Sequence, residues 1–130
     1  MGNPVDKRLY KNYLQKAEEM LEVAKHASDS SKNNAAVVSS IHCAINALDA
    51  FAVFYFGERH GGSHESALDA IKSALSKSEF DDLSKQFGGL IELKNQAEYQ
   101  PDLMSSRDAS NAVKRASRIF SKVKEKLPEI

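Results

Sequence analysis

The sequence contains a single cysteine, Cys43, so no disulfide can form within the chain. Small secreted domains usually depend on such bridges, and we therefore expect a reducing, cytoplasmic environment. The longest uninterrupted apolar run covers residues 50–56, far short of the roughly 18 residues that suggest a membrane span. The first residues also lack the basic and then apolar pattern of a signal peptide. We expect neither export nor membrane insertion.

A strong excess of one charge is also missing, because 18 Lys and Arg residues balance 18 Asp and Glu residues. Proteins that bind nucleic acid mainly by neutralising phosphates are usually basic overall. The charge is nevertheless uneven: residues 105–130 carry more bases than acids, and residues 58–102 carry more acids than bases. Two interpretations of the basic end stay open. It is either a solvated helix face with cations near a helix C-terminus, or a surface for an anionic partner.

No segment alternates polar and apolar residues as a strand does, and apolar residues instead recur every three or four positions, which is typical of amphipathic helices. Asn3-Pro4 can cap and open the first helix, which we expect to extend to about Ala27. Its apolar stripe consists of Val5, Leu9, Tyr13, Ala17, Met20, Ala24 and Ala27.

A polar segment, residues 28–34, separates this helix from a second one that Asn33 or Asn34 can cap and that ends near Phe56, before Gly57. The second helix has two adjoining apolar stripes. They are Val37, Ile41, Ala44, Leu48, Phe51 and Tyr55, and Val38, Ile45, Ala52 and Phe56. So wide an apolar face predicts contacts on two sides, either as a central helix or as one shared with another subunit.

A short third helix can be capped by Ser63 and end near Lys77, with Ala67, Leu68, Ile71 and Leu75 as its apolar positions. Ser78 followed by Asp81 resembles a capping box and predicts the start of a fourth helix. That helix contains Gly88-Gly89, which costs about 1 kcal/mol per glycine unless close packing requires it. We expect a kink or a close helix approach there.

The segment 100–102 breaks the chain, and Ser105 with Asp108 forms a second box at the start of the last helix. Short connections between long amphipathic helices favour antiparallel neighbours. We therefore predict an all-α protein, an antiparallel up-and-down four-helix bundle with one additional short helix, formed as a single domain by residues 1–130.

Four polar residues of the second helix, Ser39, His42, Asn46 and Asp49, follow one another at spacings of three, four and three and therefore share one face. This stripe either hydrogen-bonds neighbouring helices and solvent, or it lines a ligand cleft. The sequence leaves both interpretations open.

Arg59 and His64 flank a glycine-bearing loop and can place a permanent cation beside a titratable base. Such a pair can hold a phosphate and move a proton, which makes Arg59 and His64 the candidate catalytic residues. In the alternative interpretation, Arg59 caps the second helix and His64 pairs locally.

A metal site is not indicated, although His42, Asp49, His60 and His64 lie around the same helix end. His60 and His64 are four residues apart, but the two glycines between them argue against the continuous helix that a two-histidine metal site needs. We expect no metal and no cofactor. Cys43 has no base near it in the sequence and is interpreted as a packed side chain.

Four segments together resemble the HEPN domain family: residues 41–50, residues 57–59 with the following His64, residues 93–99, and residues 105–109. The family pattern has an Ala-rich second helix, a Gly-x-Arg turn followed by His, an Arg-x-x-Ala-x-Tyr segment, and an Ala-rich last helix opened by Ser. The resemblance spans nearly the whole chain.

This resemblance implies a helical bundle that usually dimerises and acts in nucleotide or RNA transactions, often beside a minimal nucleotidyltransferase in toxin–antitoxin or defence systems. Many members are ribonucleases that use an Arg and, four to six residues later, a His. This chain has Lys94 and Tyr99-Gln100 at the corresponding positions. Lys lacks the guanidinium fork and Tyr is a poor base at neutral pH, which argues against metal-independent RNA cleavage.

A chemically sensible site would gather Asp49, Arg59 and His64 near the end of the second helix and add residues of the fourth helix. The candidate ligand-binding residues are Asp49, Lys94, Asn95, Glu98, Tyr99, His42 and Asn46. The alternative is a polar network that holds the helices in register. Our first interpretation is a non-catalytic homodimer, formed through the second and fourth helices, that binds a nucleotide, RNA or a protein partner. A ribonuclease and a purely structural interaction bundle are the other two.

Overall fold

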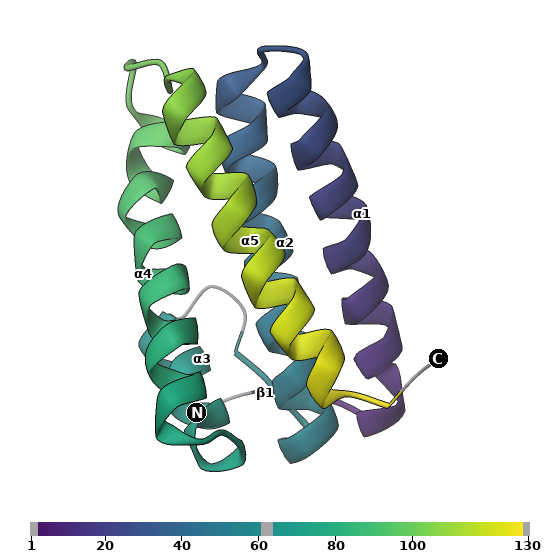
Figure 1. Ribbon diagram of the computed structural model, residues 1–130. Helices are drawn as coiled ribbons and strands as arrows, with labels where there is room; N and C mark the ends of the chain where they lie inside the picture. The colour runs from purple at the N-terminus through teal and green to yellow at the C-terminus, as the bar shows by residue number, and fades with distance from the viewer. Residues whose placement is uncertain (1–2, 61–63, 129–130) are drawn as a thin grey trace.

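The computed structural model describes residues 3–60 and 64–128, and the protein is all-α, as predicted (Figure 1). The helices are α1 (Tyr10–Asp29), α2 (Asn33–Phe56), α3 (His64–Ile71), α4 (Lys77–Tyr99) and α5 (Ser106–Lys126). Single 3₁₀ turns at Lys7–Leu9 and Lys72–Ala74 precede α1 and follow α3. The four long helices lie side by side, and α2 contacts each of the other helices. The colours of Figure 1 show that α1 and α2 run in opposite directions, and that α4 and α5 do too.

The start of the first helix differs from the prediction. Asn3–Pro4 does not open a helix but forms a short strand, β1, which pairs antiparallel with β2 (Glu58–Arg59). The backbone N–H of Val5 then donates to the carbonyl of Gly57 at 2.9 Å. Asp6 provides the cap, because its side chain accepts from the backbone N–H of Arg8 at 2.9 Å. A pairing between residues so far apart in the sequence leaves no local pattern, which is why this strand pair was missed.

The predicted stripe of α1 is buried at Ala17, Ala24 and Ala27, and Val5, Tyr13 and Met20 pack against the core from its edge. Leu9 is exposed and Tyr13 is only half-buried. The buried side chains are those of Tyr10, Leu14, Ala17, Leu21, Ala24 and Ala27.

The helix α2 is the central helix, and its wide apolar face is covered by α1, α4 and α5 of the same chain. By length and composition α2 could cross a membrane, but 72 % of its most apolar 18-residue window is buried inside the protein. Gly57 ends the helix as predicted, with φ of 67° in the left-handed region that favours glycine. The predicted asparagine cap is wrong: Lys32 stands at the N-cap, and Asn34 Oδ1 instead accepts from the backbone N–H of Met104 at 2.6 Å.

The capping box of α4 lies two residues before the predicted one. Ser76 Oγ accepts from the backbone N–H of Glu79 at 3.1 Å, and Glu79 Oε1 accepts from the backbone N–H of Ser76 at 3.0 Å. The prediction of Ser78 as the cap was therefore wrong, because the longer Glu side chain two residues earlier already closes a box. The box of Ser105 and Asp108 at α5 is confirmed. The predicted cap Ser63 lies outside the described residues.

The glycine pair of α4 marks a close approach rather than a break. The helix continues through Gly88 and Gly89 to Tyr99. A Cβ atom on Gly89 would overlap the guanidinium of Arg115 on α5, whereas a Cβ atom on Gly88 would have no neighbour within 4 Å. A side chain at position 89, but not at position 88, would therefore displace the end of the Arg115 side chain.

Candidate functional site

The polar stripe of α2 passes from the surface into the core. His42 is exposed, Ser39 and Asn46 are half-buried, and Asp49 is 1 % exposed. Asn46 donates from Nδ2 to the carbonyl of His42 at 2.9 Å, so part of this stripe hydrogen-bonds within the helix. Its two ends make different contacts, which define two separate groups of side chains.

The first group joins α2 to α4 and consists of His42, Lys94, Glu98 and Tyr99, here called the α2/α4 cluster. Lys94 Nζ donates to Glu98 Oε2 at 2.8 Å, and His42 Nε2 lies 3.4 Å from Glu98 Oε1. The Glu98 side chain is only 13 % exposed. One of its carboxylate oxygens faces Lys94 and the other faces His42, largely shielded from water. Lys94 and Glu98 are four residues apart on α4, and a helix places side chains at this spacing next to each other.

The charges of this cluster shift the pKa values of its members. Burial acts to raise the pKa of Glu98, but the hydrogen bond from Lys94 and the charges of Lys94 and His42 outweigh it and lower that pKa. The hydrogen bond to Glu98 raises the pKa of Lys94 against the effect of burial. The cluster therefore holds a charged pair at neutral pH, and neither Lys94 nor Glu98 is tuned to act as an acid or base there.

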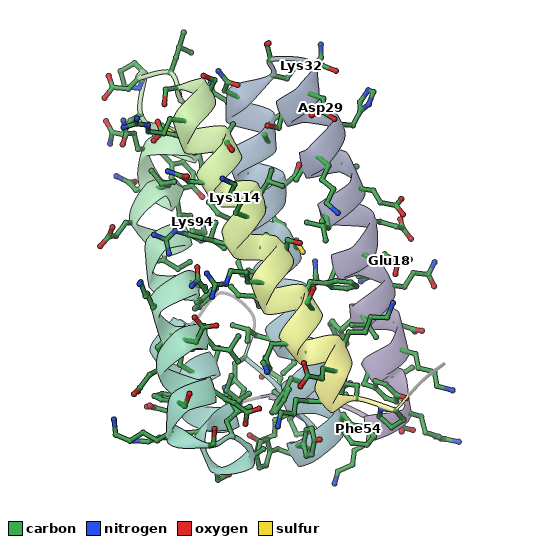
Figure 2. All side chains as sticks on the ribbon, in the orientation of Figure 1. Glu18, Asp29, Lys32, Phe54, Lys94 and Lys114 are labelled. Atoms are coloured by element: carbon green, nitrogen blue, oxygen red, sulfur yellow. The ribbon has the colours of Figure 1, made fainter. Side chains whose placement is uncertain are left out.

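An exposed aromatic ring stands beside the ion pair. Tyr99 is 72 % exposed, and the ammonium of Lys94, labelled in Figure 2, lies 5.5 Å from the centre of its ring. Asn95 is exposed on the same helix. An open ring next to hydrogen-bonding groups is the combination that stacks on and contacts a nucleobase.

The second group surrounds the buried carboxylate of Asp49, at the end where α2 leads into β2. Arg59 Nε lies 3.3 Å from Asp49 Oδ2, and the backbone N–H of His60 donates to Asp49 Oδ1 at 3.2 Å. The guanidinium of Arg59 also lies 5.9 Å from the ring centre of Tyr13 on α1. The pairing of β1 with β2 fixes the backbone of Arg59. We call Asp49, Arg59 and Tyr13 the Asp49 group.

His60 is more deeply placed than the sequence indicated. Its side chain is 6 % exposed, with Nδ1 2.6 Å from Ser66 Oγ and Nε2 3.4 Å from Glu58 Oε2. The sequence suggested His60 only as a weak metal candidate, and it gave no signal for the contact between Tyr13 and Arg59. The contact of His60 with Ser66 depends on how α3 packs against the end of α2, and the contact of Arg59 with Tyr13 depends on how α1 does.

The structure thus brings together some of the predicted site residues. Asp49 contacts Arg59, whereas Lys94 contacts Glu98 and Tyr99, and His42 joins this second set. The expectation of one site that gathers both sets is therefore not met by these contacts. The two groups are separate, because His42 and Asp49 are seven residues apart on α2, which is about 10 Å along a helix. The side chain of His64 lies outside the described residues, so the predicted catalytic pair of Arg59 and His64 stays a prediction.

Metal and thiol chemistry have little support here. Among the residues that the structure describes, no three His, Cys, Asp or Glu side chains are grouped so that they could hold a metal ion. Cys43 is buried, and burial raises the pKa of its thiol to about 12. A thiol of such high pKa is a poor nucleophile at neutral pH.

Comparison with known proteins identifies one family. The model of the HEPN domain matches residues 10–126, which runs from the start of α1 to the end of α5. No curated protein matches the sequence.

Proposed function

Because this chain belongs to the HEPN domain family, we propose that it is a nucleotide- or RNA-binding module that does not catalyse a reaction. The family match supports a nucleotide- or RNA-related role in general. The finer proposal includes the antiparallel up-and-down four-helix bundle with one short helix as the scaffold. It also includes the α2/α4 cluster as the binding site.

The non-catalytic proposal rests on the ion pair that Lys94 forms with Glu98. The ribonucleases of the family that this chain resembles use a guanidinium and a histidine base at the positions that correspond to Lys94 and Tyr99-Gln100. Here Lys94 is held at 2.8 Å by Glu98, and the position of the base is taken by Tyr99, which is 72 % exposed. A paired ammonium and an open phenol can bind a ligand, but they cannot take a proton from a ribose hydroxyl at neutral pH.

The same groups suit binding. The ring of Tyr99 offers a face for a base, and stacking of this kind contributes about 1–3 kcal/mol per base. Lys94 offers a point charge for a phosphate, at the cost of loosening its bond to Glu98. Asn95 and Asn46 add amide groups along the same two helices, and His42 adds an exposed ring nitrogen.

Binding can be tested by fluorescence anisotropy with labelled adenosine nucleotides and a labelled short oligouridylate. We expect Tyr99→Ala to weaken the better ligand about tenfold or more, from the loss of stacking. Lys94→Gln should weaken it less. The control is Lys77→Gln, which removes the lysine of another one-turn pair on α4, Lys77 with Asp81 at 3.0 Å, far from the cluster. Equal binding by all variants would contradict the proposed site.

The ribonuclease alternative is tested by incubating purified protein with RNA in the presence of a metal chelator. We expect no cleavage. Metal-independent cleavage that is lost in Arg59→Ala or His64→Ala, with helical content unchanged in circular dichroism, would replace our proposal by an enzyme.

We further propose a cytoplasmic homodimer that is paired with a minimal nucleotidyltransferase, as in a toxin–antitoxin system. Only the family resemblance supports the dimer and the nucleotidyltransferase partner, because the apolar face of α2 that suggested a subunit contact is covered within the chain. The proposal of a cytoplasmic location rests on the single cysteine. A single monomer mass in light scattering at all micromolar concentrations would refute the dimer. Co-purification with a partner, without any affinity for nucleotides or RNA, would instead favour a purely structural interaction bundle.

A further inference from the structure

The seam between α4 and α5 contains a groove of about 250 Å³ that is separate from both groups described above. It is lined by Lys85, Gln86, Asn111, Lys114, Arg115 and Arg118, here called the basic groove. Figure 2 shows Lys114 on α5, beside α4. Four of the six lining residues are cationic, in a chain whose net charge is zero. The groove shares no residue with the α2/α4 cluster or the Asp49 group.

A hydrogen-bonded chain fixes the two arginines of the basic groove. Gln86 is 4 % exposed, and its Oε1 accepts from Arg115 Nη1 at 3.2 Å. Arg115 Nη1 also donates to the carbonyl of Lys85 at 3.3 Å. The other end of Gln86 donates from Nε2 to Asp82 Oδ1 at 3.1 Å, and the same oxygen lies 3.5 Å from Arg118 Nη2. The buried amide therefore positions Arg115 and, through Asp82, Arg118.

The guanidinium of Arg115 fits this position only because Gly89 of α4 has no side chain. Both of its hydrogen bonds to described residues use Nη1, so Nη2 makes none with that part of the chain. A guanidinium that is held in place and only partly used is suited to bind a phosphate with little further loss of freedom.

The positive charge extends along α5 beyond the groove. Arg107, Asn111, Lys114 and Arg118 follow at spacings of four, three and four and therefore lie on one helix face. This row is about 16 Å long at 1.5 Å per residue. Lys85, Arg107 and Lys114 form no ion pair with any residue in the described part of the chain, and Asp82 is the acidic side chain in contact with Arg118. A row of this length matches several successive phosphates better than one isolated anion.

We propose that the basic groove binds the phosphodiester backbone of a nucleic-acid strand, with phosphates at Lys85, Lys114, Arg115 and Arg118. Arginine forks match phosphate oxygens in pairs, and a backbone needs no apolar anchor. The large exposed apolar side chains, which a protein partner or a membrane would use, lie outside the groove. They are Leu9, Val23, Phe56, Tyr99 and Leu103.

The test is a salt titration of the binding of a labelled oligouridylate, followed by anisotropy. Four phosphate contacts predict a logarithmic salt slope of about −3, because each contact on a single strand adds about 0.7. By the same relation, Lys114→Gln should weaken binding about fivefold at 0.1 M salt and reduce the slope by about 0.7. The matched control is Lys25→Gln, which neutralises an exposed lysine on α1 and should leave both values unchanged.

A second pair of variants separates position from charge. Gly89→Ala keeps every charge but displaces the guanidinium of Arg115, and it should weaken binding severalfold. Gly88→Ala, one residue away in open space, should not.

Three results would overturn the basic groove as a nucleic-acid site. One is equal binding by wild type and Lys114→Gln, and another is full competition by inorganic phosphate at equal phosphate concentration. The third is tighter binding of polyglutamate than of the oligouridylate, which would identify an acidic protein as the occupant. Loss of binding in Tyr99→Ala with no effect of Lys114→Gln would refute this groove and leave the α2/α4 cluster supported. Loss of binding in Lys114→Gln with no effect of Tyr99→Ala would refute the α2/α4 cluster and leave the basic groove supported.

Discussion

Adding one methyl group should stabilise the protein at one of the two neighbouring glycines of α4 but not at the other. Gly88→Ala places a Cβ in open space, so the variant should gain the helix propensity difference of about 1 kcal/mol. With an unfolding entropy of about 2.1 cal/mol/K per residue, this raises the Tm of a chain of 130 residues by about 4 °C. Gly89→Ala gains the same backbone term but pushes Arg115 off Gln86 and the carbonyl of Lys85. Leaving the buried Gln86 oxygen unpaired costs about 1–3 kcal/mol, so the variant should be unchanged or less stable than wild type.

The measurement is thermal and urea unfolding followed by circular dichroism, with both glycine variants made in the wild type and in Arg115→Ala. Without the guanidinium, the methyl group at position 89 meets no obstacle. Gly89→Ala should then stabilise the Arg115→Ala protein by about 1 kcal/mol, as Gly88→Ala does. If Gly89→Ala stabilised the wild type as much as Gly88→Ala, the argument that Gly89 makes room for Arg115 would be refuted.

Three further outcomes follow from the caps, charges and core. Ser76→Ala should lower the free energy of unfolding by about 1 kcal/mol and Ser78→Ala by much less, because only Ser76 caps α4; equal losses in urea unfolding would contradict this assignment. The hydrogen bonds from Lys126 and from the backbone of Ser76 lower the pKa of Glu79 from 4.5 to about 2. The folded state thus binds this proton less readily than the unfolded state, so the stabilisation by Glu79 is complete above about pH 5 and disappears as the pH falls to 2. The Tm difference between wild type and Glu79→Gln should close over that range, and parallel profiles would argue against it. Cys43, whose pKa burial raises to about 12, should resist iodoacetamide at pH 8 until urea unfolds the protein, and rapid labelling of the native state would refute its burial.

Local patterns were sufficient to predict the five helices but not all of their ends. Apolar spacing of three and four residues located α2 and α5, and Gly57 and Ser105 marked helix ends where the structure has them. The start of α1 could not be predicted, because it depends on the pairing of Asn3 with Arg59, which no local pattern records. At α4 the sequence contains two overlapping box patterns, and the choice between Ser76 and Ser78 depends on which acid reaches back to the cap.

The candidate site shows the same division. Lys94 and Glu98 stand one helical turn apart, so their pairing follows from the sequence. The contact of Asp49 with Arg59 was also expected, since Asp49 lies in the last two turns of α2 and Arg59 follows the helix closely. That these two sets form separate groups depends on the pitch of α2 and on the packing of α4 against it. The basic groove could not be predicted from the sequence either, because Gln86 and Arg115 come from different helices. The contact of Gly89 with the guanidinium of Arg115 likewise exists only when α5 packs against α4.

The position of α2 has a consequence for how the molecule unfolds. The helix α2 contacts α1, α3, α4 and α5. The helical hairpin of α4 and α5 therefore packs against the hairpin of α1 and α2 through the buried side chains of α2. Neither hairpin can be lost without exposing the apolar side of the other, so the chain should melt in one cooperative transition. A cavity made at Phe51, which is fully buried in the last third of α2, would destabilise both hairpins together.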